Sequence, residues 1–424
     1  MKQTILVVGS GGREHAIARA FSNSQSVKKV FVAPGNPGML LDKAGIIECV
    51  PIAVTAVEEL AAFVIEHEVA VTFVGPEQPL ELGIVDYFEQ RDLAIVGPSK
   101  VAAQLENSKW FAKKIMAEAN VQTAKYQYFS AKDHQEALAY CLEIGLPCVI
   151  KADGLMAGKG VVIPESLDEA KETLERMMVD NDTSVLIEEF LTGTEFSHFS
   201  LVNGEHIISL GSACDYKRVF DADKGANTGG MGAFSPVPWV DQQLNQQIID
   251  EIVLPVAKEM VRQETPFTGI LYTGIILTDK GPKVIEFNTR LGDPETQILL
   301  PLFEADFNEI IEAHLNKQVF EIERKQQTNL GVVLAAAGYP GVCKTEIPLS
   351  VPEKLATHVL YAGVGGEADA LHSTGGRILM MTATGANLEE ARDNAYQLLS
   401  QLEIEDTFYR QDIGLHRELK EGIE

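Results

Sequence analysis

The chain has 424 residues, 46% of them apolar and 23% charged, which is ordinary for a globular protein of about two to four domains. Its net charge of −26 argues against a nucleic-acid partner, and no apolar run reaches the ~18 residues of a membrane helix. The N-terminus resembles a first strand more than a signal peptide, and five scattered cysteines without a CxxC pair fit a reduced cytosol.

Strands alternate with helices in the N-terminal part, the pattern of α/β layers. The strand TILVVGS precedes a helix at about 13–22, and the strands VKKVFVAPG, VAVTFVGPE and LAIVGPS each end near Gly or Pro. Ligands in open parallel sheets bind at the carboxyl ends of the strands. We therefore expect a ligand site at residues 9–12, 34–38, 75–77 and 97–99.

The segment GSGGREHA, residues 9–16, joins the first strand to the first helix. Its glycines let the backbone approach a phosphate at the helix N-terminus. The dinucleotide fingerprint GxGxxG fails because Glu14 stands at its third glycine, and the second strand lacks the acidic residue that would hold an NAD ribose. The segment therefore predicts a phosphate site and argues against NAD, with a plain tight turn as the alternative.

A helix at about 100–119 leads into the middle of the chain. The elements expected after it are a compact insert at 124–192, strands near 195–202 and 206–213, the loop GANTGGMGAFSP, a long helix near 241–263, and the strands GILYTGIILT and PKVIEFN. The last part contains the apolar runs LGVVLAAAGYPG, HVLYAGV and GRILMMTATG and a helix near 388–402.

The segment KADGLMAGKG, residues 151–160, places two lysines and three glycines between two apolar runs. It is not a Walker A loop, because Gly160 follows Lys159 where Ser or Thr is needed. We predict a hairpin that closes over a triphosphate, with Lys151 reaching in from the strand. A lysine about 4 Å from a phosphate oxygen contributes up to ~4 kcal/mol at an effective dielectric of 20, so local cations can outweigh an acidic surface. A solvated hairpin is the alternative.

Two further segments carry acidic residues at strand ends. EEFLTGTE, residues 188–195, fits an adenine and ribose site or simply a charged strand end. In KVIEFNTRLGDPETQ, residues 283–297, Glu286 and Asn288 alternate on one strand face and suit Mg²⁺, and Arg290 offers a fork for a carboxylate. A structural salt-bridge cluster is the alternative here.

In this order, KADGLMAGKG, EEFLTGTE, NTGGMGAFSP and VIEFNTRLGDPETQ resemble the ATP-grasp enzymes, and more narrowly the phosphoribosylamine–glycine ligase family. The resemblance covers essentially the whole chain, including GSGGREHA, GPE, QLENSKWFAK and FYRQDIG. It implies an α/β fold with a Rossmann-like domain at 1–103, an ATP-grasp domain at 104–325 with a mobile flap at about 124–192, and a small C-terminal α/β domain at 326–424.

The resemblance also implies an activity. ATP would phosphorylate glycine to glycyl phosphate, and 5-phosphoribosylamine would then attack, giving glycinamide ribonucleotide, ADP and phosphate in purine biosynthesis. ATP and Mg²⁺ or Mn²⁺ would be the cofactors. The protein would be a cytoplasmic monomer in transient contact with the upstream amidotransferase, without nucleic-acid or membrane partners.

The site residues follow from the same resemblance. Catalysis would involve Arg290, Lys151 and Asp215, and the metal would be ligated by Glu286 and Asn288. ATP would be bound by Lys109, Lys151, Gly158, Lys159, Gly160, Glu188, Glu189, Phe190, Leu191 and Glu195. The substrates would be bound by Gly11, Gly12, Asn36, Gly38, Glu77, Asp215, Lys217, Arg290, Gly292, Asp293 and Pro294.

The chain departs mildly from the family pattern. Thr289, Leu291 and Thr194 replace a frequent Cys, Phe and Glu, which leaves the expected activity intact but changes the packing beside the ligands. No general base stands out, with Asp215 and Glu295 as candidates. Three other readings stay open: another ATP-grasp ligase such as a biotin carboxylase-like enzyme or a formate-using transformylase, a nucleotide-binding regulatory protein without turnover, and an NAD-dependent reductase.

Overall fold

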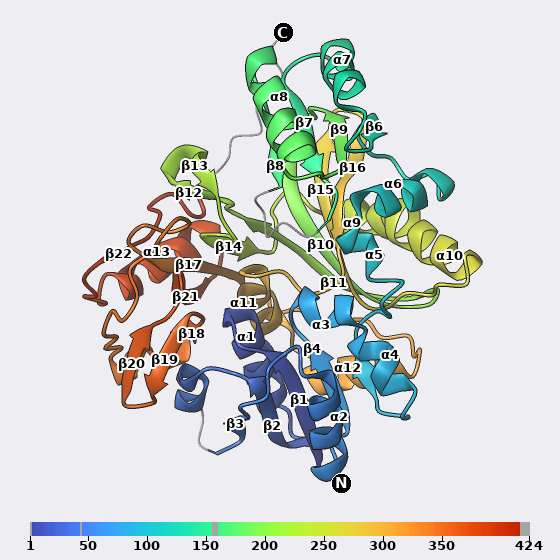
Figure 1. The fold of residues 1–424 in the computed structure, drawn as a ribbon. Helices are drawn as coiled ribbons and strands as arrows, with labels where there is room; N and C mark the ends of the chain where they lie inside the picture. Colours follow the sequence, from blue (N-terminus) through green and yellow to red (C-terminus); the bar gives the residue numbers. More distant parts are fainter. Residues whose placement is uncertain (1, 43–44, 155–159, 416–424) are drawn as a thin grey trace.

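The computed structural model describes residues 2–42, 45–154 and 160–415. Its N-terminal part is a parallel sheet of β1 (Gln3–Gly9), β2 (Val27–Pro34), β3 (Ile47–Cys49), β4 (Val71–Val74) and β5 (Ile95–Val96), in the order β3-β2-β1-β4-β5 (Figure 1). Successive residues of β1 are buried on opposite faces, as expected for a parallel sheet covered on both sides. The carboxyl ends of β2, β1 and β4 therefore lie side by side.

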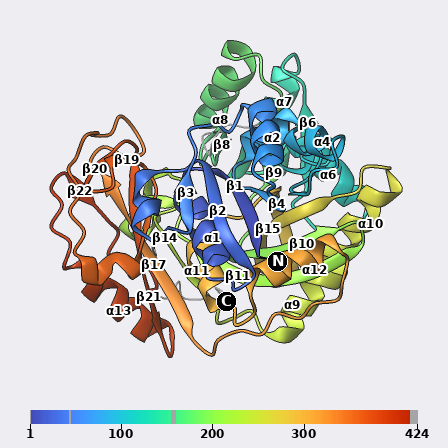
Figure 2. The same ribbon diagram turned by 90° about the horizontal axis from the view of Figure 1, so that it is seen from below.

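Helices cover both faces of this sheet, which lies in front in Figure 2. One face packs against α1 (Gly12–Ser22) and α12 (Phe307–Leu315), through Ile17, Phe21 and Phe307. The other face packs against α2 (Val57–Glu66), α3 (Glu77–Leu82) and α4 (Ile84–Glu89). Because α12 comes from the middle of the chain, the N-terminal sheet shares a core with the segments that follow it.

A second sheet of nine strands forms the centre of the molecule. Its order is β16 (Gly281–Asn288), β15 (Thr268–Thr278), β10 (Thr194–Asn203), β11 (His206–Asp215), β14 (Gly232–Ser235), β17 (Thr328–Ala336), β21 (Arg377–Gly385) and β18 (Val359–Tyr361), with β22 (Thr407–Phe408) paired to β17. All of its pairs are antiparallel. The sheet runs without a break from the central part of the chain into the C-terminal part.

A smaller antiparallel sheet lies at the top of Figure 1. It consists of β6 (Tyr126–Phe129), β9 (Val185–Glu189), β7 (Cys148–Ala152) and β8 (Val161–Val162), in that order. The helices α7 (His134–Ile144) and α8 (Leu167–Leu174) pack on it around a separate apolar core that includes Phe129, Ile150 and Leu174. We call this unit the flap sheet; it corresponds to the compact insert expected at 124–192.

Most of the remaining elements are short. They include the 3₁₀ helices at Pro37–Leu41, Asp221–Asp223, Leu300–Leu302 and Glu353–His358, a π-helical segment at Glu175–Asp180, the hairpins β12–β13 (Arg218–Phe220 and Lys224–Asn227) and β19–β20 (Val364–Glu367 and Ala370–Ser373), and the helices α11 (Glu295–Leu299) and α13 (Leu388–Leu399). The long helix expected near 241–263 is α9 (Gln242–Ile248) and α10 (Leu254–Arg262), joined by a π-helical segment at Ile249–Val253. Among the described residues, none of the helices combines the length and hydropathy of a membrane span.

The prediction of a single helix at 100–119 is wrong. The structure has α5 (Gln104–Asn107) and α6 (Lys109–Glu118), separated by Ser108 in an extended conformation. The Ser108 hydroxyl accepts the Phe111 amide at 3.1 Å, and Asp153 accepts the Lys109 amide at 2.7 Å. Serine is favoured at a helix N-cap, so a new helix begins here and points its first amides at the flap sheet.

Candidate active site

One face of the central sheet gathers polar side chains where it meets the flap sheet. Glu286, Gly274 and Ser197 are directly opposite one another on β16, β15 and β10, and so are Asn288 and Tyr272. Residues opposite each other in a sheet share a face. The two residues predicted to ligate a metal therefore lie on the same face as Ser197 and Tyr272.

A β-bulge on β16 produces this arrangement. Val284 is opposite Ile275 and Glu286 is opposite Gly274, which leaves Ile285 unopposed. A bulge shifts the alternation of side chains by one residue, so both Val284 and Phe287 enter the same apolar core. The Ile285 carbonyl, freed from the ladder, accepts a hydrogen bond from Lys151 Nζ at 3.1 Å.

The charge on Glu286 is balanced by four cations. Burial alone would raise the pKa of its carboxyl group, but Lys217, Lys151, Lys109 and Arg290 hold that pKa below the ordinary value of 4.5. The carboxylate is therefore ionised at neutral pH. An ionised carboxylate and an amide oxygen fit Mg²⁺, which completes its shell with phosphate oxygens and water. The described residues contain no cluster of three or more His, Cys, Asp or Glu side chains placed to hold a metal.

Glu188 on β9 lies between two buried lysines. Its carboxylate is 3.2 Å from Lys113 Nζ and 3.0 Å from Lys151 Nζ, and Lys113 also donates to Thr123 Oγ1 at 2.7 Å. Burial lowers the pKa of Lys113 to about 8. These contacts join α6 to the flap sheet and fix the direction of Lys151. Lys113 was not recognised as a site residue from the sequence.

The other residues predicted to bind ATP differ in their contacts and burial. Lys109 Nζ donates to the Gly154 carbonyl at 2.9 Å, and burial lowers its pKa. Glu189 accepts the Lys125 amide at 3.0 Å. Phe190 and Glu195 are exposed, Leu191 is half-buried and Gly160 is buried. Gly158 and Lys159 lie outside the described residues.

Arg290 lies between the N-terminal and central parts of the chain. Its guanidinium is 3.1 Å from Glu106 on α5 and 3.6 Å from Glu77 on α3. Burial would lower its pKa, but these two carboxylates raise it above the ordinary value. Glu106 also accepts the amide and the hydroxyl of Thr289, at 2.7 and 3.0 Å. The threonine that departs from the family pattern thus helps to orient the partner of Arg290.

Acidic groups dominate the β11 side of the same face. Asp215 ends β11, and Glu295 begins α11, which packs against that strand. Burial and Asp215 raise the pKa of Glu295 to about 7. Ser197 Oγ lies 3.4 Å from Glu295 and donates to Tyr272 Oη at 2.7 Å. Tyr272 and Asp215 raise the pKa of Lys217. Burial raises the pKa of Tyr272, so its hydroxyl group is neutral at neutral pH and Asp215 is the charged neighbour of Lys217.

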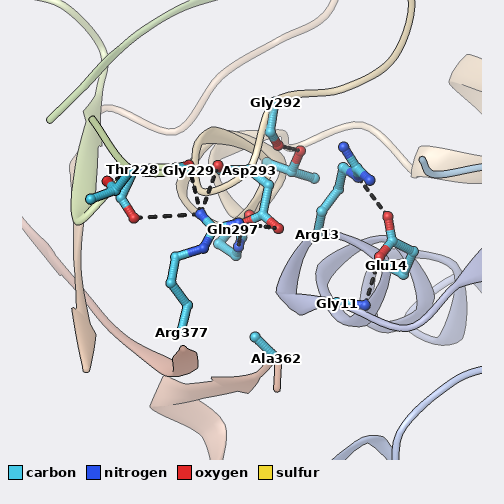
Figure 3. Close-up of polar contacts among 12 residues, drawn as sticks. Gly11, Arg13, Glu14, Thr228, Gly229, Gly292, Asp293, Gln297, Ala362 and Arg377 are labelled. Atoms are coloured by element: carbon cyan, nitrogen blue, oxygen red, sulfur yellow. Dashed lines mark hydrogen bonds and ion pairs between the residues drawn. The ribbon is translucent and has the colours of Figure 1, made fainter. Parts of the chain in front are cut away.

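Asp293 is held by an arginine from the far end of the chain (Figure 3). Arg377 on β21 donates to the carbonyls of Gly229 and Asp293 at 2.7 and 2.9 Å, and its guanidinium is 3.2 Å from the Asp293 carboxylate. Gln297 donates to the same carboxylate at 2.7 Å. A side chain on Gly230 would lie 2.3 Å from Pro294, so the glycine loop packs closely on this turn. Neither Arg377 nor Gln297 was predicted.

The remaining predicted substrate residues lie beside this turn. A side chain on Gly11 would be 3.5 Å from Asp293, and one on Gly12 would be 2.8 Å from Gln297. Asn36 is buried and donates to the Ser10 carbonyl at 2.7 Å. The structure thus brings the residues after β1 against the turn after β16, and Asn36, after β2, bonds to this segment. Gly38 packs on the Tyr361 ring, and Gly292 contacts the Glu295 carboxylate.

Glu14 changes the glycine turn that suggested a phosphate site. Its carboxylate accepts the Gly11 amide at 2.7 Å and pairs with Arg13 at 2.5 Å. A side chain at Gly9 or Gly75 would lie 2.3 or 2.2 Å from it, so Glu14 fills the space between two strand ends. The Gly11 amide is therefore already bonded within the chain, and the phosphate site expected at residues 9–16 remains a prediction.

Comparison with known families gives three matches in chain order. Models of phosphoribosylglycinamide synthetase match with the N domain at 3–106, the ATP-grasp (A) domain at 107–296 and the C domain at 329–416. The phosphoribosylamine–glycine ligase of Halalkalibacterium halodurans is 45% identical over 97% of this chain and 96% of its own length. The chain belongs to the phosphoribosylglycinamide synthetase family.

Solved structures agree with this membership. The phosphoribosylamine–glycine ligase from Thermotoga maritima matches with a TM-score of 0.84 and 32% identity, over 97% of this synthetase-family chain and 100% of that one. A biotin carboxylase from Campylobacter jejuni matches with a TM-score of 0.71 and 16% identity, over 98% and 94%, which shows a shared fold alone. The expected family and the three-domain α/β architecture with an ATP-grasp centre are confirmed. The boundaries at 103/104 and 325/326 and the roles of the site residues remain predictions.

Proposed function

We propose that this protein joins glycine to 5-phosphoribosylamine at the expense of ATP, forming glycinamide ribonucleotide, ADP and phosphate in purine biosynthesis. Family membership and the names of the relatives support the reaction. The structural observation that carries it is the convergence of Lys109, Lys151 and Arg290 on ionised Glu286. In this reaction a negatively charged triphosphate must approach a negatively charged carboxylate. Cations already in place at the site reduce the repulsion between them.

The first step transfers the γ-phosphoryl group of ATP to the glycine carboxylate. A carboxylate oxygen forms a bond to the γ-phosphorus, the bond to the bridging oxygen breaks, and ADP leaves with the electron pair. Lys109 and Lys151 neutralise the phosphate oxygens as charge builds on them. Lys151 is suited to this role because Glu188 and the Ile285 carbonyl hold its ammonium group in place.

Glu286 and Asn288 would hold the divalent ion. We propose Mg²⁺, with Mn²⁺ as a substitute; when bound, the ion supplies Lewis-acid polarisation of the phosphate oxygens. Two protein ligands leave most of the coordination shell of the ion open, which fits an ion that also binds oxygens of the nucleotide. The nucleoside part of ATP would contact the strand end at 188–191 and Glu195.

The second step forms the carbon–nitrogen bond. The amine of phosphoribosylamine attacks the carbonyl carbon of glycyl phosphate, the bond to the phosphate oxygen breaks, and phosphate leaves with the electron pair while the nitrogen loses a proton. Gly11, Gly12, Asn36, Gly38 and Glu77 would hold this substrate at the strand ends of the N-terminal sheet. Arg290, bound by Glu77 and Glu106, would position the reacting carboxyl group beside it.

The experiment that tests this function is ADP release with glycine and phosphoribosylamine, each omitted in turn. Full release is expected only with both substrates and a divalent ion. Release supported by bicarbonate or formate in place of glycine would indicate another ATP-grasp ligase. ATP binding without any release would indicate a regulatory protein, and binding of a nicotinamide nucleotide would indicate a reductase. We further propose a cytoplasmic monomer that meets the upstream amidotransferase only transiently.

A further inference from the structure

Two carboxylates lie together over one part of the central sheet. Ser197 is paired with Ala213, two residues before Asp215 on β11, so Ser197 and Asp215 share a face. Glu295 extends from α11 to within 3.4 Å of the Ser197 hydroxyl and is only 3% exposed. The side chains of Asp215 and Glu295 therefore converge on the same small region, between β11 and the start of α11.

Neither carboxylate makes a salt bridge with a side chain of the described residues. Within the described part of the chain, no Lys, Arg or His nitrogen lies within 4.0 Å of Asp215 or Glu295. Ser197 has one hydroxyl proton, which it donates to Tyr272. Glu295 therefore receives at most a weak, shared hydrogen bond from Ser197. Glu295 is buried, and a buried carboxylate without a salt bridge is costly, because burial removes its water without replacing it. A positively charged ligand would remove this cost by binding to the carboxylate.

The charges around the site are distributed unevenly. On the β11 side, Tyr272 and Asp215 raise the pKa of Lys217 well above the ordinary value. On the β16 side, Lys151, Lys109 and Arg290 join Lys217 in lowering the pKa of Glu286. A ligand with a positive and a negative end would therefore bind in one direction, with its positive end towards β11.

We propose that Asp215 and Glu295 together bind the ammonium group of glycine and so select an amino acid over other small carboxylates. This inference rests on the proposed function. The nitrogen and the carboxyl carbon of glycine are about 2.5 Å apart, two covalent bonds. An ammonium held by the two carboxylates therefore directs the glycine carboxylate towards the cations near Glu286. Bicarbonate and formate would leave both carboxylates without a partner, and a site that holds polar groups for one substrate rejects an analogue that lacks their partner.

The pH dependence follows from Glu295. Its pKa of about 7, raised by burial and Asp215, means that the ionised form needed to bind an ammonium group is lost as the pH falls below 7. The groups that face Glu295 are Asp215, Lys217, Tyr272 and Arg290. The last three do not titrate between pH 6 and 8, because their pKa values lie above the ordinary ones. The KM for glycine should be about tenfold higher at pH 6 than at pH 8.

The test compares Glu295→Gln with Glu309→Gln, the same change at an exposed position on α12. At pH 8, we expect Glu295→Gln to raise the KM for glycine at least tenfold, to leave the KM for ATP within twofold, and to remove the rise in glycine KM towards pH 6. Glu309→Gln should behave as the native protein. Asp215→Asn should also raise the glycine KM.

Two outcomes would overturn the inference. One is an unchanged glycine KM and pH profile in Glu295→Gln; the other is a loss of kcat with normal glycine KM, which would place Glu295 in proton transfer. Should the variant fail to fold, calorimetry on the native protein still decides. Glycine binding at pH 7 should release protons, seen as a heat that depends on the ionisation enthalpy of the buffer, and no release would refute the proposal. ADP release that does not need glycine would instead refute the proposed function itself.

Discussion

Arg377 allows a quantitative test of how a distant strand shapes the substrate site. Its guanidinium donates to the carbonyls of Gly229 and Asp293 at 2.7 and 2.9 Å and pairs with the Asp293 carboxylate (Figure 3). A hydrogen bond from a charged donor contributes about 1.5 kcal/mol or more. The two short bonds together therefore stabilise the contact between the glycine loop and the turn at Asp293 by roughly 3 kcal/mol. About 3 kcal/mol corresponds to a factor of ~100 in an equilibrium constant.

The change Arg377→Met keeps a flexible, unbranched apolar side chain and removes every donor. We expect the KM for phosphoribosylamine, generated in the assay, to rise by up to about a hundredfold while the KM for ATP changes less than about twofold. The control is Arg262→Met, because Arg262 has a side chain 66% exposed and surface ion pairs contribute little. An unchanged phosphoribosylamine KM, or equal increases for both substrates, would refute the argument that Arg377 orders this part of the site.

Three further predictions concern the metal, the nucleotide and acid stability. Glu286→Ala should abolish metal-dependent ADP release while the circular dichroism spectrum stays native; full activity would remove Glu286 from the metal site. Lys151→Ala should raise the KM for ATP far more than that for glycine, and an unchanged ATP dependence would reject its assignment. His15 and Arg19 lower the pKa of Asp42 to about 2 despite its burial, so Asp42 contributes about 2 kcal/mol of stability that is present above pH 4 and lost as the pH falls towards 2. The melting temperature of Asp42→Asn should therefore lie below the native one at pH 7 and approach it at pH 3; a constant difference would contradict the linkage.

The meeting of the strand ends in the N-terminal sheet could be predicted because its signals are local. Apolar runs that stop at Gly or Pro define β1, β2 and β4, and a parallel sheet brings their carboxyl ends to one edge. What Glu14 does there could not be predicted. The sequence shows only that a glycine is missing from the fingerprint, whereas the structure shows a carboxylate that accepts the Gly11 amide.

The features that escaped prediction depend on contacts distant in sequence or on single-residue shifts. Arg377 reaches Asp293 across 84 residues, and no spacing rule connects them. Lys113 looks like any helical lysine until Glu188 is placed beside it by the flap sheet. The bulge at Ile285 depends on the register between β15 and β16. The apolar pattern of the strand shifts by one residue at the bulge, so simple alternation does not reveal this register.

The uninterrupted central sheet limits how this chain can be divided. β14 has four residues and pairs with β11 on one side and β17 on the other. A truncated protein that stops ahead of β17 would leave Ala233 and Phe234 on an unpaired edge, and such edges recruit other chains. Recombinant fragments trimmed to the ATP-grasp region should therefore aggregate unless the strands from 328 to 385 are supplied with them.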